Sequence, residues 1–97
     1  MTKQWPFSDA ENTAVFTSKG IVNRVDWIHY VTHDADDGAW QFHPNLGPTS
    51  EKDAAVVSLK SIIEIDETIL SLADLPQGWH AWRESRSSPW IRTPQKQ

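Results

Sequence analysis

The chain has 97 residues, of which 38% are hydrophobic and 23% charged, and its formal net charge is −4. These values are typical of one folded globular domain and exclude a disordered chain, and no apolar run approaches the roughly 20 residues that cross a bilayer. The absence of cysteine excludes a disulfide framework and thiolate chemistry. The first residues carry no apolar signal segment, so we expect a cytoplasmic protein that does not bind membranes.

The N-terminal residues mix proline with polar side chains and show no periodicity. We interpret residues 1–12 as a flexible arm, from which Trp5 and Phe7 can dock on the body. A β-prone stretch over 14–18 follows and ends at the pair Lys19-Gly20. This pair predicts a turn into a second extended stretch, as in a hairpin.

The middle of the chain alternates in the way that strands do. Alternation over 25–33 predicts the longest strand, residues 34–38 supply turn residues, and 39–43 resumes the alternation with Trp40 and Phe42 on one face. The two strands should therefore be antiparallel neighbours.

Two short helices are predicted after a mobile loop over 44–50 and a short β-prone run. Ser58 is placed to cap the first helix, whose apolar side chains recur every three or four residues. Asp66 is placed to cap the second, over 67–73, with an acidic residue against the N-terminal dipole.

A last strand, over 79–83, follows a Pro-Gln-Gly turn, and we interpret 85–97 as a polar, basic tail. The pattern predicts a single α+β domain over 13–84, with an antiparallel sheet of about four to six strands and two short helices on one face. We expect Trp40, Phe42 and Trp82 to form its core.

No motif in the sequence carries catalytic or metal chemistry. A calcium loop that begins at Asp34 has its glycine and its last ligand out of place. His29 and His33 would lie about 13 Å apart along a strand, and His33 and His43 could meet across the hairpin but lack a third ligand. Serines lack a nucleophile elbow and glycines form no phosphate loop. We therefore predict no enzyme activity, no metal and no cofactor.

Charge is unevenly distributed along the chain. Residues 1–82 have a net charge of −7, whereas residues 83–97 have a net charge of +3. An acidic body argues against nucleic acid as the partner, because phosphates are bound by basic surfaces. A basic protein partner fits better, and the alternative for the polar tail is a solvated terminus with no partner.

The candidate partner-binding residues are acids of the hairpin and aromatic or basic residues near the C-terminus. They are Asp34, Asp36, Asp37, Trp79, Arg83 and Trp90. The chain has six tryptophans, and exposed tryptophans flanked by arginines are typical of binding hot spots. Trp79 and Trp90 are either such anchors or a lid over one end of the domain.

Several segments together resemble a bacterial family known as domain of unknown function 2185, which is similar to immunity proteins of polymorphic toxin systems. The segments are Thr17-Ser18-Lys19, Asp37-Gly38-Ala39-Trp40-Gln41-Phe42, the run from Val57 to Asp66, and the run from Leu75 to Arg83. The resemblance covers about residues 13 to 84 and implies a binding domain with no catalytic residues.

These observations predict a non-catalytic protein-binding module, and the resemblance implies an immunity protein that neutralises a toxin. The alternative is a small-molecule or regulatory ligand-binding domain in which Trp79 and Trp90 stack on a ring or sugar. Saturable quenching of tryptophan fluorescence by a small molecule would favour the alternative.

Overall fold

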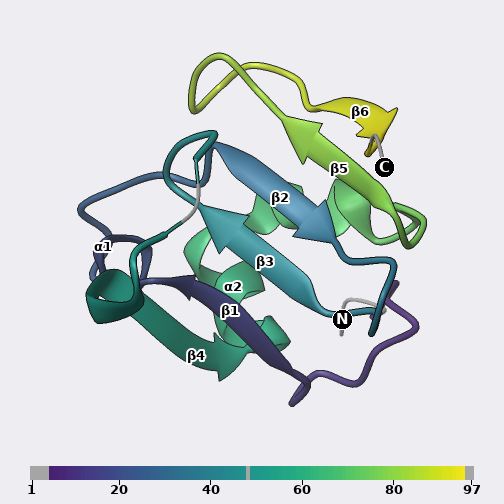
Figure 1. The fold of residues 1–97 in the computed structure, drawn as a ribbon, viewed down its shortest axis with the longest axis horizontal. Helices are drawn as coiled ribbons and strands as arrows, with labels where there is room; N and C mark the ends of the chain where they lie inside the picture. Colours follow the sequence, from purple (N-terminus) through teal and green to yellow (C-terminus); the bar gives the residue numbers. More distant parts are fainter. Residues whose placement is uncertain (1–4, 48, 96–97) are drawn as a thin grey trace, which may run out of the picture.

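The computed structural model describes residues 5–47 and 49–95, and within them the chain forms a six-stranded sheet with four short helices (Figure 1). The strands are β1 (Ala14–Ser18), β2 (Tyr30–His33), β3 (Trp40–His43), β4 (Ala54–Ser58), β5 (Trp79–Trp82) and β6 (Ile91–Pro94). The helices are α1 (Lys19–Val22), α2 (Leu59–Ile65) and the 3-10 helices η1 (Glu51–Asp53) and η2 (Glu67–Leu72). The predicted α+β class is confirmed.

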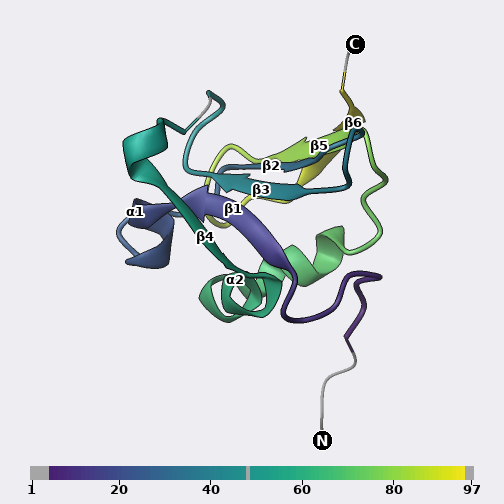
Figure 2. The ribbon, with the colours of Figure 1, turned by 60° about the horizontal axis from the view of Figure 1, so that its bottom comes forward.

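The strand order is β4-β1-β3-β2-β5-β6. Neighbours run antiparallel except β1 and β3, which run parallel, so the sheet is mixed. The predicted antiparallel pairing of β2 and β3 is confirmed. Figure 2 shows α2 and η2 beneath one face of the sheet. Among the described residues no helix covers the centre of the opposite face, and η1 lies at its edge, where the chain enters β4. Within the described residues, no helix is long and apolar enough to span a membrane.

The prediction of a hairpin after β1 is wrong, because the chain there forms the helix α1. Ser18 caps this helix, with its hydroxyl oxygen accepting a hydrogen bond from the backbone N–H of Ile21 at 3.1 Å. The backbone N–H groups of Val25 and Asp26 then bond to the carbonyl of Gly20. These bonds keep the start of the predicted strand 25–33 out of the sheet, so that β2 begins only at Tyr30.

Both helices predicted from capping residues are confirmed. Ser58 accepts a hydrogen bond from the backbone N–H of Ser61 at 3.1 Å at the start of α2. Asp66 accepts one from the backbone N–H of Thr68 at 3.0 Å at the start of η2, which is a 3-10 helix. A side-chain cap acts over three residues, so it can be read from the local sequence.

The core lies between the sheet and the helices. Trp40 and Phe42 are 1% and 0% exposed and belong to it as predicted, but the prediction for Trp82 is wrong. Ala81 pairs with Val31, which also pairs with Phe42, so Ala81 faces the core and Trp82 faces the other way. The side chain of Trp82 is half-buried on the face without helices.

Both terminal segments are held by the domain where the structure describes them. Phe7 is 5% exposed and packs edge-to-face on Trp40, with ring centroids 5.5 Å apart. The segment expected to be a polar tail contributes β6, which pairs antiparallel with β5. Residues 1–4 of the predicted arm and 96–97 of the predicted tail lie outside the described residues.

Candidate functional site

The uncovered face of the sheet gathers aromatic and polar side chains in register across its strands. The pairing places His43, Tyr30, Trp82 and Ile91 in one row, and Gln41, Thr32, His80 and Thr93 in the next. Phe16 and Val56, paired on β1 and β4, extend this face and are 47% and 60% exposed. The solvated side of a sheet usually carries polar residues, so the two rows fit a face that meets water, and Phe16, Val56 and Ile91 are its exposed apolar part.

Hydrogen bonds fix the centre of this face. The Tyr30 hydroxyl lies 2.8 Å from His80 Nδ1, and His80 Nε2 lies 2.7 Å from Thr93 Oγ1. The imidazole therefore links β2, β5 and β6. Among the described residues no carboxylate contacts His80, so this chain of contacts lacks the acid that orients a catalytic histidine.

A hollow of about 560 Å³ opens on the same face. Its strand side is formed mainly by Phe16, Tyr30, Thr32, Asp34, Gln41 and His43, and its rim by Leu46, Gly47 and Thr49 of the loop before η1. Gln41 Nε2 donates a hydrogen bond to Asp34 Oδ2 at 2.6 Å, and His43 Nδ1 lies 2.8 Å from Thr49 Oγ1. The volume is within the range of small-ligand and side-chain sites.

The hollow has a negative charge at neutral pH. Burial lowers the pKa of His43, and the nearby negative charge of Asp34 offsets this only in part. His43 is therefore neutral at pH 7, and the described residues that line the hollow include no lysine or arginine to balance Asp34.

The predicted acids lie at the hairpin between β2 and β3. Asp36 and Asp37 are exposed, and Asp37 accepts a hydrogen bond from the backbone N–H of Ala39 at 2.9 Å, which supports the turn. Asp34 points into the hollow with Gln41. The structure thus joins one predicted acid to residues that were not predicted for the site.

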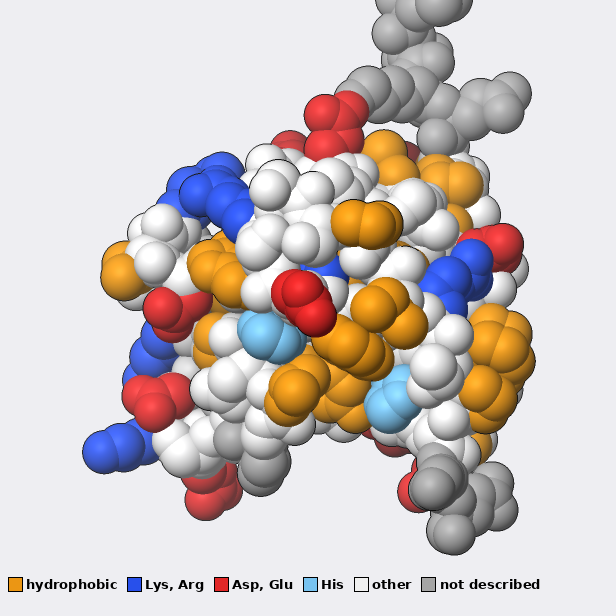
Figure 3. Space-filling model, turned by 90° about the horizontal axis from the view of Figure 1, so that it is seen from above, with side chains coloured by type: hydrophobic (Ala, Val, Ile, Leu, Met, Phe, Trp, Pro, Cys, Tyr) orange, Lys and Arg blue, Asp and Glu red, His pale blue; other side chains and the backbone are white. Residues whose placement is uncertain are grey.

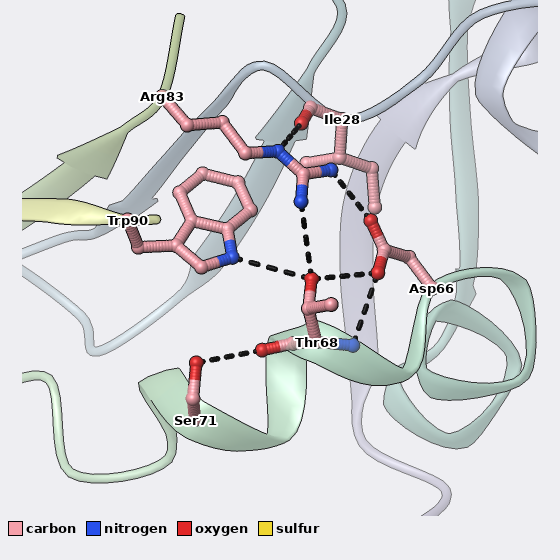
Figure 4. A network of polar contacts seen from close by, with 6 residues as sticks. All are labelled: Ile28, Asp66, Thr68, Ser71, Arg83 and Trp90. Atoms are coloured by element: carbon pink, nitrogen blue, oxygen red, sulfur yellow. Dashed lines mark hydrogen bonds and ion pairs between the residues drawn. The ribbon is translucent and has the colours of Figure 1, made fainter. Parts of the chain in front are cut away.

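Arg83 lies on the opposite side of the sheet, where it is 1% exposed. Figure 4 shows its guanidinium donating to the Ile28 carbonyl at 2.9 Å, Thr68 Oγ1 at 3.2 Å and Asp66 Oδ2 at 2.6 Å. These contacts tie β5 to η2. The guanidinium is enclosed within the domain, so the predicted direct contact with a partner does not fit its burial.

The two candidate tryptophans also lie against the domain. The Arg83 guanidinium carbon stands 4.3 Å from the ring centroid of Trp90, whose Nε1 donates to Thr68 Oγ1 at 3.3 Å. Trp79 is half-buried and packs against the core. Of the two alternatives considered for these residues, packing over one end of the domain fits these contacts.

Apolar side chains nevertheless remain at the surface near this end. Figure 3 looks down on the edge crossed by the connection between β5 and β6, where apolar side chains gather next to two histidines. Ile91, 41% exposed, and the half-buried Trp82 are paired on the uncovered face, whereas Trp27 and Trp90 are half-buried beside Arg83. Apolar surface at this end of the sheet therefore comes from both of its sides.

The ion pair with Arg83 also determines the ionisation of Asp66. Burial alone would raise the pKa of Asp66, but hydrogen bonds from Thr68 and Arg83, together with the charge of Arg83, hold this pKa below its ordinary value. Asp66 is therefore ionised at neutral pH and caps η2 as a carboxylate.

Residues 5–47 and 49–95 contain no group of three histidine, aspartate or glutamate side chains that could hold a metal ion. His33 and His43, which could have met across the hairpin, lie on different faces of the sheet. His33 pairs with Trp40 on the core side, and its Nδ1 lies 2.6 Å from the Leu75 carbonyl oxygen, whereas His43 lies on the uncovered face.

Sequence reasoning missed the residues that form the hollow, namely Phe16, Tyr30, Gln41 and His43. The available signal was the alternation itself, because Gln41 and His43 were expected opposite Trp40 and Phe42.

Comparisons with protein-family models, curated proteins and solved structures found no match to this chain. The resemblance to the domain of unknown function 2185 family stays a prediction.

Proposed function

We propose that the chain is a non-catalytic module that binds a basic protein through the uncovered face of its sheet. The observation that carries the proposal is this face itself. Phe16 and Val56 stay exposed on β1 and β4, Ile91 stays exposed on β6 at the other edge, and Tyr30 and Trp82 are half-buried between them. When apolar side chains stay exposed together on a small domain, that surface is more often an interaction site than a surface that meets only water. Aromatic side chains in such a cluster provide contact area at low entropic cost.

Charge at the ends of this face supports a basic partner. Asp34, Asp36 and Asp37 lie at the β2–β3 hairpin, and Glu51 and Asp53 lie in η1, next to the strand β4. Acids around an apolar centre raise the association rate of a basic partner and disfavour acidic ones. The resemblance to immunity proteins makes a bacterial toxin the partner that we propose.

The test is site-specific photo-crosslinking in cells that naturally express the protein. A benzophenone amino acid replaces Phe16 or Val56 on the uncovered face, and Glu64, exposed on α2, serves as the matched control on the helical side. We expect one basic protein to be crosslinked from positions 16 and 56 and not from 64. The yield should fall when Asp36 and Asp37 are replaced by lysine.

Equal adducts from position 64, or none from positions 16 and 56, would overturn the proposal. The identity of the crosslinked protein then tests the immunity role. If that protein stops growth when expressed alone and growth returns on co-expression with this chain, the toxin assignment holds. A partner that does not affect growth in either case refutes it.

A second candidate, binding of a small molecule, is favoured by the hollow, whose volume suits such a ligand. The stacking platform would be Tyr30 or Phe16, since Trp90 already stacks on Arg83. A titration of tryptophan fluorescence separates the two candidates. Saturable quenching by a metabolite, without protein crosslinks, would support this function.

A further inference from the structure

The hollow combines one carboxylate with aromatic and hydrogen-bonding walls, and no lysine or arginine of residues 5–47 and 49–95 lines it. We infer that it receives an arginine side chain of the partner, an inference that rests on the proposed function. The guanidinium would pair with Asp34 and stack on Tyr30 or Phe16. Arginine fits such a site because its planar cation can bind a carboxylate and lie on an aromatic ring at the same time.

The geometry of Asp34 leaves one oxygen for an incoming donor. Gln41 Nε2 donates to Oδ2 at 2.6 Å and holds the carboxylate in place, whereas Oδ1 has no hydrogen-bond partner among the residues that the structure describes. A carboxylate that is fixed before binding loses little freedom when it pairs with a cation.

The charge of the hollow is uncompensated at neutral pH. Among the described residues that line the hollow, Asp34 is the acidic one and none is lysine or arginine. Burial lowers the pKa of His43 and keeps it uncharged, so the lining is negative. An anionic ligand would be repelled by Asp34, and a neutral ligand would leave the charge of its carboxylate without a counter-charge. A cation is therefore the complementary occupant.

Further polar and aromatic groups suit a guanidinium. Phe16 is 47% exposed and Tyr30 half-buried, so both offer surface to a flat group. Thr32 also lines the hollow, is 6% exposed, and its Oγ1 has no hydrogen-bond partner among the described residues. That oxygen is a hydrogen-bond acceptor beside the hollow that no described residue uses.

The test uses N-acetyl-arginine amide as the probe, followed in the amide NMR spectrum of the ¹⁵N-labelled full chain. We expect saturable shifts of the Gln41 side-chain amide and of the Gly47 backbone amide. The isosteric neutral N-acetyl-citrulline amide should leave both unshifted. Asp34→Asn should weaken arginine binding about fivefold, because a partly exposed charged pair is lost while the hydrogen bond with Gln41 can remain.

Asp36→Asn is the matched control, since it removes the same charge from the same hairpin but outside the lining. Equal binding of the citrulline amide, or equal weakening by Asp34→Asn and Asp36→Asn, would overturn the arginine site. N-acetyl-lysine amide that binds as tightly as the arginine probe would contradict the preference for a planar cation.

The two proposals fail in different experiments. Crosslinks from positions 16 and 56 without any shift by the arginine probe would refute the hollow as an arginine site and leave protein binding intact. Selective shifts without crosslinks would support the hollow as a site for a guanidinium group, but would refute protein binding through this face and with it a partner's arginine as the occupant.

Discussion

Replacing Arg83 by methionine should destabilise the domain far more than the same change at Arg92. Both arginines form an ion pair with an aspartate, at 2.6 Å for Asp66 and 2.8 Å for Asp74. The side chains differ in exposure, at 1% for Arg83 and 33% for Arg92. The substitution is the same at both positions, so the comparison contrasts an enclosed arginine, which also contacts Ile28, Thr68 and Trp90, with a more exposed arginine in a similar ion pair.

The expected loss for Arg83→Met is about 3 kcal/mol, the lower end of the range for removing one partner of a buried pair. The lower end applies because the Asp66 side chain stays 16% exposed and keeps its hydrogen bonds with Thr68. The carbonyl of Ile28 also loses its guanidinium donor. A domain of this size has about 5 to 15 kcal/mol of stability, so the variant should still fold.

The assay is urea unfolding followed by tryptophan fluorescence, with a double-mutant cycle between Arg83→Met and Asp66→Asn. Asparagine keeps the cap of η2 and removes only the charge, so the double mutant should lose less than the sum of the single losses. Arg92→Met should change the urea midpoint little, because exposed pairs stabilise weakly. Equal losses for Arg83→Met and Arg92→Met, or strictly additive losses in the cycle, would refute the reasoning.

Three further predictions test the core, the turns and the pH dependence. Trp40→Ala should cost about 3 to 5 kcal/mol in urea unfolding, and Trp82→Ala clearly less, because only Trp40 is enclosed; equal costs would contradict the assignment of faces. Gly78→Ala should cost about 1 to 2 kcal/mol, since Gly78 has φ +84°, whereas Gly47→Ala, where an added Cβ meets no atom closer than 3.5 Å, should be nearly neutral. The pKa of Asp66 is lower in the folded state than its ordinary value of 3.8. The stability that ionised Asp66 contributes is therefore fully present above pH 3.8 and is lost as the pH falls through the lowered pKa. The urea midpoint should fall on acidification, and it should fall less steeply in Asp66→Asn.

Local signals in the sequence predicted the elements that depend on few neighbouring residues. The caps Ser58 and Asp66 were identified because each side chain bonds to a backbone N–H two or three residues ahead. Ser18 acts in the same way, but Lys19-Gly20 was interpreted as a turn between strands, so α1 was missed. One helical turn is too short to show a periodic apolar face.

Long-range pairing explains what was not predicted. Alternation separates Trp82 from Ala81, but it does not say which of them faces the core, and a tryptophan is the more usual core residue. The pairing of Ala81 with Val31, which lies 50 residues earlier in the sequence, places Ala81 on the core face. The hollow joins β1, β2 and β3 through the same kind of pairing, so its residues could be recognised singly but not as one site.

The end of β6 has a consequence for self-assembly. Pro94 is the last residue of this edge strand and lies opposite Trp79. A proline has no backbone N–H to donate, so another copy of the chain cannot continue the ladder at this position. The sheet therefore cannot be extended by a regular ladder at this position, which disfavours growth into fibrils.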